Sequence, residues 1–234
     1  MSFGPAWYPV ALSNGIDPGR SAGTRLFDQE LCIWRDTEGV AHAWEDRCPH
    51  RGMRLSFGFV RGDKIACLYH GWQYDRQGQC RLIPAHPDLE VPATIRAARY
   101  SCQELLGMLW VYAEREAATP PVLALDARDV VPVRSLYIQC APSAVMQALV
   151  ERSKTIGAAS ATLLTLDADE QSVVAGLQPF GASKTALHLV LPAPVADRAA
   201  RQHAVASWAE ELRRRLEDEA EPAAERAAVH EAAL

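Results

Sequence analysis

The sequence predicts a mainly β domain of antiparallel sheets over residues 1–115, followed by a smaller α+β domain over residues 134–218. Two observations predict this division. The first half consists of short apolar runs broken by turn residues, without helical periodicity, whereas the second half has apolar residues at helical spacing beside strand-like runs. Residues 116–133, rich in alanine, proline and charge, are expected to form a linker, and residues 219–234 a tail.

Five runs of the first half have the residue types of β-strands. They are residues 31–35, 40–44, 64–68, 79–83 and 106–112. The segments Asp36–Gly39, Arg61–Asp63 and Asp75–Gly78 separate some of them and have the composition of tight turns. Antiparallel hairpins are therefore expected.

The second half is expected to contain strands, a short helix and a long helix. The strand-like runs are residues 135–140, 161–166, 172–177 and 185–191, and the short helix covers residues 143–153 after Pro142. The long helix is indicated by apolar residues at helical spacing, namely Val205, Trp208, Leu212 and Leu216. Pro222 interrupts the tail, which we expect to be a fraying helix or disordered.

The overall composition excludes several classes of function. Hydrophobic residues make up 49% of the chain and charged residues 23%, as in ordinary globular proteins. The net charge of -5 provides no general basic surface, so nucleic acid is not an expected partner. No apolar run approaches the roughly 20 residues that cross a bilayer, and residues 1–10 lack a secretion signal, so no membrane association and a cytoplasmic location are expected.

Six cysteines are present, and they differ in their neighbours. In a chain of this size without a secretion signal, reduced thiols or metal ligands are expected in place of disulfides. Four of them lie in or near apolar runs or a turn and are expected to act as small hydrophobes: Cys32, Cys80, Cys102 and Cys140. Cys48 and Cys67 each have a histidine at the spacing of metal ligands.

Two short segments, which we call the first hook (Cys48–Gly52) and the second hook (Cys67–Trp72), supply one cysteine and one histidine each. Their candidate ligands are Cys48, His50, Cys67 and His70. Zinc fingers normally pair two cysteines in one hook and two histidines in the other. A Rieske 2Fe-2S centre instead uses two cysteines on one iron and two histidines on the other, so that mixed hooks suit it.

The ligand types also indicate the chemistry of such a centre. Two ferric ions, two sulfides and two thiolates sum to zero charge, so the cluster accepts one electron more easily than a cluster with four thiolates. The outer nitrogens of His50 and His70 are expected to couple reduction to proton uptake. Gly52 and Gly71 let the backbone approach and direct N–H groups toward the sulfurs.

The stretch from Asp46 through both hooks to Pro84 closely resembles Rieske non-haem iron oxygenases of the ring-hydroxylating and O-demethylating type. Segments 7–10 and 107–112 also look like that family's domain edges. The resemblance covers about the first half of the chain, and it implies a second ligand shell of Arg51, Gly52, Tyr69, Gly71 and Trp72. Leu68 replaces a proline often found in the family. The hooks contain no additional cysteine for a clamping disulfide, which points to the lower-potential oxygenase branch.

The same family carries a mononuclear iron held by two histidines and a carboxylate. The corresponding helix, residues 144–153, contains no histidine. His188 is expected to be a hydrogen-bonded core residue, His203 is too loosely spaced from Asp197, and His230 is expected to be solvated in the tail. Mononuclear iron is therefore not expected on this chain, and the α+β domain resembles a truncated helix-grip domain of the family.

These features suggest an electron-transfer subunit of a heteromeric oxygenase. It would form a hetero-oligomer, take electrons from a reductase or ferredoxin, and pass them to the mononuclear iron of a catalytic oxygenase subunit. One alternative is a self-sufficient small oxygenase or demethylase with unusual iron ligands that include His188 or His203. Another is a Rieske ferredoxin, which leaves the second domain unexplained; a purely structural role leaves the ligands unexplained.

Overall fold

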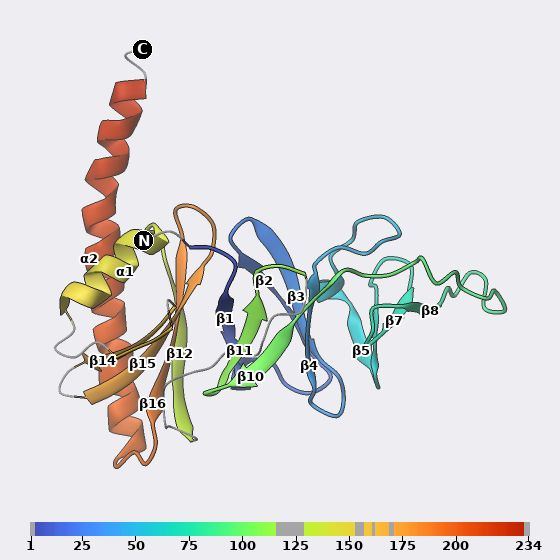
Figure 1. The fold of residues 1–234 in the computed structure, drawn as a ribbon, viewed down its shortest axis with the longest axis horizontal. Coiled ribbons are helices and arrows are strands. Elements are labelled where there is room, and N and C mark those ends of the chain that lie inside the picture. Colours follow the sequence, from blue (N-terminus) through green and yellow to red (C-terminus); the bar gives the residue numbers. More distant parts are fainter. Residues whose placement is uncertain (1–2, 116–128, 153–156, 161, 169–170, 232–234) are drawn as a thin grey trace. The chain divides into compact units, whose positions relative to one another are not determined.

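The computed structural model describes residues 3–115, 129–152, 157–160, 162–168 and 171–231. The chain divides into two compact units, Phe3–Pro121 and Val122–Leu234. Residues 116–128, which make up most of the expected linker, lie outside the described residues. Figure 1 labels most of the helices and strands of both units.

Three antiparallel sheets make up the N-terminal unit (Figure 1), so the expectation of a mainly β domain is confirmed. Their strand orders are β1-β11-β10, β2-β3-β4-β9 and β5-β6-β7-β8. Two short 3-10 helices accompany them, η1 (Ser13–Gly15) and η2 (Leu55–Phe57). The strands are β1 (Trp7–Leu12), β2 (Ser21–Leu26), β3 (Gln29–Arg35), β4 (Ala41–Glu45), β5 (Phe59–Arg61), β6 (Lys64–Ala66), β7 (Gln73–Asp75), β8 (Cys80–Leu82), β9 (Arg99–Tyr100), β10 (Cys102–Leu105) and β11 (Met108–Tyr112).

Each of the five expected strands of this unit has a counterpart, and six further strands were not expected. Strand β6 ends two residues earlier than expected, because Cys67 opens a turn. The missed strands are β1, β2, β5, β7, β9 and β10. Local sequence signals them poorly: β1 contains Pro9, which lies at a register irregularity in the pairing with β11, about a hundred residues further on.

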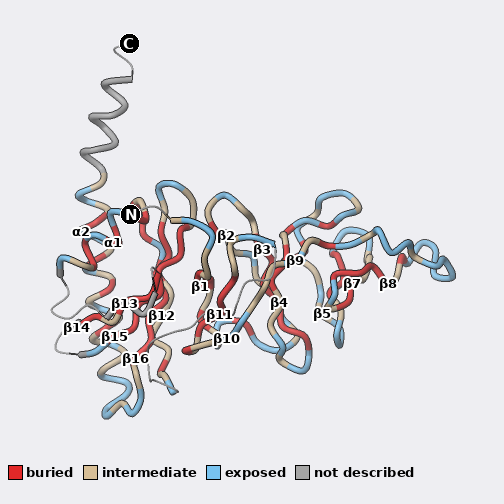
Figure 2. The backbone as a smooth tube through the Cα atoms, in the orientation of Figure 1, coloured by how far each residue is buried: buried red, intermediate tan, exposed pale blue. Residues whose placement is uncertain are grey.

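Strand β3 connects two apolar clusters, because successive side chains of a strand point to opposite faces. Cys32 and Trp34 enter one cluster, and Leu31 and Ile33 enter the other. Figure 2 shows buried positions along β3 and β4. The first cluster also contains Cys48 and Cys67, so the two hooks start from packed residues.

Trp34, Trp44 and Tyr74 are the largest buried side chains of this first cluster. Trp44 meets Trp34 edge-on with ring centroids 5.1 Å apart, and it meets Tyr74 edge-on at 6.5 Å. Edge-on aromatic pairs contribute about 0.5–1.5 kcal/mol beyond their buried area. These rings therefore form a packed layer in the cluster that also contains Cys48 and Cys67 of the hooks.

The C-terminal unit is a five-stranded antiparallel sheet with two helices, as expected for an α+β domain. The strand order is β12-β16-β15-β14-β13, and Figure 1 shows both helices on one side of the sheet. Central strand β16 is buried along nearly its whole length. The elements are β12 (Val130–Ile138), α1 (Pro142–Arg152), β13 (Gly157–Ser160), β14 (Leu163–Ala168), β15 (Gln171–Pro179), β16 (Thr185–Pro192) and α2 (Arg198–Glu231).

Two expected boundaries of this unit are wrong. The linker was placed as far as residue 133, but β12 already begins at Val130, because Pro132 lies on an edge strand at a register irregularity where its missing N–H is tolerated. The tail was placed from residue 219, but α2 continues to Glu231, since alanine and glutamate favour helix; of the two alternatives given for the tail, the structure has the helix.

Helix α2 is 34 residues long, and four of its apolar side chains are buried: Val205, Ala209, Leu212 and Leu216. Three of them are among the residues that predicted this helix, whereas Trp208 is only half-buried. Despite its length, neither α2 nor any other helix within the described ranges combines the length and apolar character needed to cross a membrane.

Candidate metal centre

The two hooks share one backbone geometry. In each hook the cysteine N–H donates to the carbonyl five residues later, at 2.8 Å for Cys48 and 2.9 Å for Cys67. The glycine four residues after the cysteine donates back to the cysteine carbonyl, at 2.9 Å for Gly52 and 3.0 Å for Gly71. Both glycines have positive φ angles, 73° and 70°, which a side chain would strain. The hooks are therefore two closed turns of the same kind.

The four predicted ligands lie together and are sorted by atom type. The rings of His50 and His70 are neighbours, with centroids 4.7 Å apart. Burial raises the pKa of the Cys67 thiol, and the adjacent Cys48 thiol raises it further. Each hook thus contributes one donor to a sulfur pair and one to an imidazole pair.

This arrangement of sulfur and nitrogen donors distinguishes between a zinc ion and a Rieske cluster, the two metal groups compared from the sequence. A structural zinc ion needs its four ligands around one point. In the described part of the chain, no three His, Cys, Asp or Glu side chains are grouped so as to hold a single ion. A Rieske cluster needs two sulfurs at one iron and two nitrogens at the other. The donor set fits the cluster better than the zinc ion.

Several hydrogen-bond donors surround the sulfurs. The backbone N–H groups of Tyr69 and His70 bond to Cys67 and lower the pKa of its thiol, which opposes the effect of burial. The Tyr74 hydroxyl lies 3.1 Å from the Cys48 sulfur. Burial, and then Cys48, raise the pKa of Tyr74 above its ordinary value, so the hydroxyl stays protonated and is available as a donor when Cys48 is a thiolate.

Aromatic rings pack on the histidines. Trp72 stacks on His50 with centroids 4.2 Å apart and an interplanar angle of 6°. The Tyr69 ring centroid lies 3.8 Å from that of His70. His70 is exposed and His50 half-buried, whereas both cysteines are buried. The sulfurs therefore face the core, and the imidazoles lie at the surface.

The remaining residues of the expected second shell are also in the hooks. Gly52 and Gly71 supply the turn geometry, and an added Cβ at Gly71 would lie 3.1 Å from Pro84. Arg51 is exposed. Partial desolvation, then His70 and Arg51, lower the pKa of His50.

Sequence reasoning missed two supports of the hooks. Tyr74 lies on β7, two residues beyond Trp72, and its period-2 position toward the core was an available signal. Asp46 is buried before the first hook and accepts bonds from the backbone N–H (2.7 Å) and the hydroxyl (2.6 Å) of Ser56. The contact between Asp46 and Ser56 joins residues ten apart in sequence, and no local sequence pattern predicts it.

Among the described side chains of the C-terminal unit, the histidines do not form a comparable site. His188 is buried on β16, with Ser135 Oγ 2.7 Å from its Nδ1 and Gln178 Oε1 2.8 Å from its Nε2. Burial lowers the pKa of His188 to about 3, so the ring is neutral. Since Gln178 Oε1 can only accept, Nε2 carries the proton and Nδ1 accepts from Ser135. His203 is exposed on α2, and the side chain of His230 lies outside those described.

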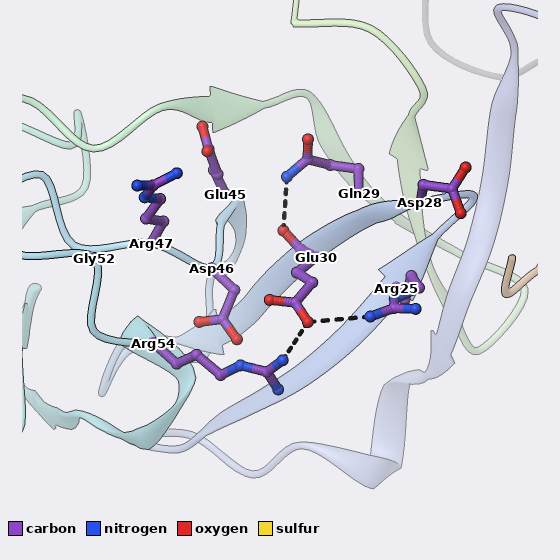
Figure 3. Close-up of a pocket in the computed structure, with 9 residues that line it drawn as sticks. All are labelled: Arg25, Asp28, Gln29, Glu30, Glu45, Asp46, Arg47, Gly52 and Arg54. Carbon is purple, nitrogen blue, oxygen red and sulfur yellow. Dashed lines mark hydrogen bonds and ion pairs between the residues drawn. The ribbon is translucent and has the colours of Figure 1, made fainter.

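A charged pocket of about 440 Å³ lies beside the first hook (Figure 3). Glu30 pairs within it with Arg25 at 3.1 Å and with Arg54. Its lining residues are Arg25, Asp28, Gln29, Glu30, Glu45, Asp46, Arg47, Gly52 and Arg54. Such a lining does not suit an apolar substrate.

Residues 6–94 match the family model described as Rieske [2Fe-2S] domain. The chain is 35% identical over 130 residues to oxidoreductase NdmD of Pseudomonas putida, which covers 55% of this chain and 22% of NdmD. It is 37% identical over 113 residues to 4beta-methylsterol monooxygenase of Methylococcus capsulatus (47% and 30%). It is also 32% identical over 122 residues to the 3-chlorobenzoate-3,4-dioxygenase oxygenase subunit of Comamonas testosteroni (51% and 28%). The matched region thus spans between about a fifth and a third of these relatives.

Solved structures extend the likeness in fold. Apo dicamba monooxygenase matches 92% of this chain and 85% of its own, with a TM-score of 0.74 at 19% identity. NdmB of Pseudomonas putida CBB5 matches 90% and 81%, with a TM-score of 0.69 at 19% identity. At these identities the likeness concerns the fold. Residues 6–94 are thus similar to a Rieske [2Fe-2S] domain, and over about half of its length the chain is similar in sequence to Rieske non-haem iron oxygenases.

Proposed function

We propose that this chain is the Rieske electron-transfer subunit of a heteromeric non-haem iron oxygenase, with the cluster held by Cys48, His50, Cys67 and His70. The observation that carries the proposal is the sorting of these side chains into a buried sulfur pair and a surface imidazole pair. When bound, a Rieske cluster accepts and releases one electron at a time.

The residues around the ligands would each have a defined task. The buried rings of Trp44 and Tyr74 exclude water from the cysteine sulfurs. Tyr74 and the N–H groups of the second hook donate to the sulfurs and stabilise added negative charge. Trp72 holds the His50 ring in one orientation. The imidazoles at the surface provide a short path for electron transfer to a partner.

A separate catalytic chain is proposed because the described C-terminal residues offer poor iron ligands. Both nitrogens of His188 are occupied by hydrogen bonds, and helix α1 contains no histidine. Some relatives have names that describe components of larger systems, such as the oxygenase component of 3-ketosteroid-9-alpha-monooxygenase. The proposed partners are a catalytic oxygenase subunit and an electron-donating reductase or ferredoxin. The four cysteines outside the hooks, which are unpaired thiols, support a reducing, cytoplasmic location.

Metal and sulfide analysis tests the proposal directly. Protein purified without oxygen should contain two irons and two acid-labile sulfides per chain and give a Rieske electron paramagnetic resonance spectrum after reduction. One metal without sulfide would contradict it. Reduced protein should also oxidise on mixing with a catalytic oxygenase chain, provided that chain carries its own iron.

A self-sufficient oxygenase is the second candidate, and one observation favours it. The fold likeness to dicamba monooxygenase extends over 92% of the chain, which includes most of the C-terminal unit. A third iron per chain without added sulfide, together with oxygen-dependent turnover by the chain alone, would favour this candidate over the electron-transfer subunit.

A further inference from the structure

Exposed apolar side chains gather next to the hooks. Seven large hydrophobic side chains are exposed in the described residues, and four of these fall within residues 57–69. They are Phe57 (56% exposed), Phe59 (54%), Leu68 (47%) and Tyr69 (61%). Single exposed hydrophobic residues are ordinary, but a local concentration of them marks an interaction surface.

Backbone pairing places the segments that carry these side chains next to each other. Strand β5 is the edge of its sheet, and Phe59 pairs with Ala66, the residue before the second hook. Gly58 lies against this neighbour so closely that an added Cβ would be 2.3 Å from the Ala66 carbonyl oxygen. Leu68 follows Ala66 by two residues, and the Tyr69 ring contacts His70. The apolar patch therefore borders an exposed imidazole of the proposed cluster.

The segment that carries Phe57 and Phe59 is rich in arginine. Residues 47–64 carry five basic side chains and one acidic side chain, although the whole chain has a net charge of -5. The Arg54 guanidinium lies 6.0 Å from the Phe57 ring centroid and pairs with Glu30. Arg47, Arg51 and Arg61 are exposed, and within the described residues none of the three forms an ion pair.

We propose that this patch and its arginines, which we call the cluster-end face, dock a one-electron donor protein whose contact surface is acidic. The inference rests on the proposed function and adds the chemistry of the partner. Charge complementarity selects an acidic protein, and it raises the encounter rate more than the affinity. Few apolar side chains with a charged rim suit the small, transient interfaces of redox partners. On docking, one electron leaves the reduced centre of the donor and converts one ferric ion of the cluster to ferrous.

Stopped-flow reduction of the cluster-loaded chain tests the proposal. The probe is a reduced plant-type 2Fe-2S ferredoxin of net negative charge, whose potential of roughly -400 mV lies below the Rieske range. The second-order rate constant should fall steeply as salt is added to the wild-type chain. Arg61→Glu should lower it about tenfold at low salt and little at high salt. Phe59→Ser should lower the second-order rate constant at both low and high salt.

Two variants with the same chemical changes serve as controls. Arg198→Glu reverses an exposed charge on α2, and Val40→Ser removes an exposed apolar side chain from the β3–β4 turn. Both should keep the wild-type rate within about twofold, because neither changes a residue of the cluster-end face. A neutral small-molecule photoreductant should reduce all the chains equally.

The outcomes separate the docking proposal from the function. Wild-type protein without two irons and two sulfides would defeat the proposed function. Intact clusters combined with a salt-independent rate, or with equal rates for Arg61→Glu and Arg198→Glu, would overturn the docking proposal alone. Self-association of the wild-type chain that Phe59→Ser abolishes would assign the face to a second copy and overturn it as well.

Discussion

The histidines of the two units show opposite uses of the same side chain. His50 and His70 lie at the surface in turns closed by glycines, with their rings 4.7 Å apart. His188 is buried in a central strand, with both ring nitrogens engaged by neighbours from β12 and β15. A ring nitrogen serves as a metal ligand only when no other hydrogen-bond partner occupies it. The accessibility of that nitrogen therefore separates a candidate ligand from a core residue.

The strongest test of this comparison is His70→Ala. We expect complete loss of the Rieske spectrum and of labile sulfide, because one iron loses one of its two nitrogen ligands. The C-terminal unit should keep its fold and its partner. Iron and sulfide analysis with circular dichroism measures both effects. A variant that retained the Rieske spectrum would contradict the proposed ligand set.

His188→Leu should have the reverse effect. Cluster content should remain, whereas the free energy of unfolding should fall by about 3 kcal/mol, since Ser135 and Gln178 would lose buried partners. Denaturant titration followed by circular dichroism measures the change. His203→Ala, at an exposed position of α2, is the matched control and should change stability by less than about 0.5 kcal/mol. Loss of bound iron from His188→Leu would instead support a second metal site.

The pH dependence of stability sharpens the same contrast. Burial lowers the pKa of His188 to about 3, whereas the unfolded chain has the ordinary value of about 6.5. Below pH 6.5, His188 binds a proton in the unfolded chain but stays neutral in the folded chain. The free energy of unfolding therefore falls as the pH drops from 6.5 toward 3. Above 6.5 this residue has no effect. The contribution is at most about 1.4 kcal/mol per pH unit, and His188→Leu should remove it from titrations made at several pH values.

Tyr74→Phe should produce the smallest effect. The cluster should assemble, but its reduction potential should decrease, because the reduced cluster loses a hydrogen bond to the Cys48 sulfur. Redox titration monitored by visible circular dichroism measures the shift. Tyr69→Phe is the control, since the Tyr69 backbone N–H bonds to Cys67 independently of its hydroxyl. Equal potentials for Tyr74→Phe and the wild type would remove Tyr74 from the tuning residues.

Much of the candidate site could be predicted because its determinants are local. A cysteine, a histidine and a glycine lie within five residues in each hook, and this spacing is visible without a fold. Alternating apolar residues with turn signals predicted the antiparallel sheets, and helical spacing predicted the core of α2. Short-range sequence therefore determined the fold class and the donor set.

Only the tertiary structure decided what depends on contacts between distant residues. Strand β1 has a weak local signal and forms through pairing with β11, about a hundred residues further on. The bond from Tyr74 to Cys48 joins residues 26 apart, and the bond from Ser135 to His188 joins residues 53 apart. Such contacts form because several buried polar groups must all find partners in one packed arrangement. Sequence alone predicted a set of four ligands for a Rieske centre, and the packed fold decided that His188 is not available as a further ligand.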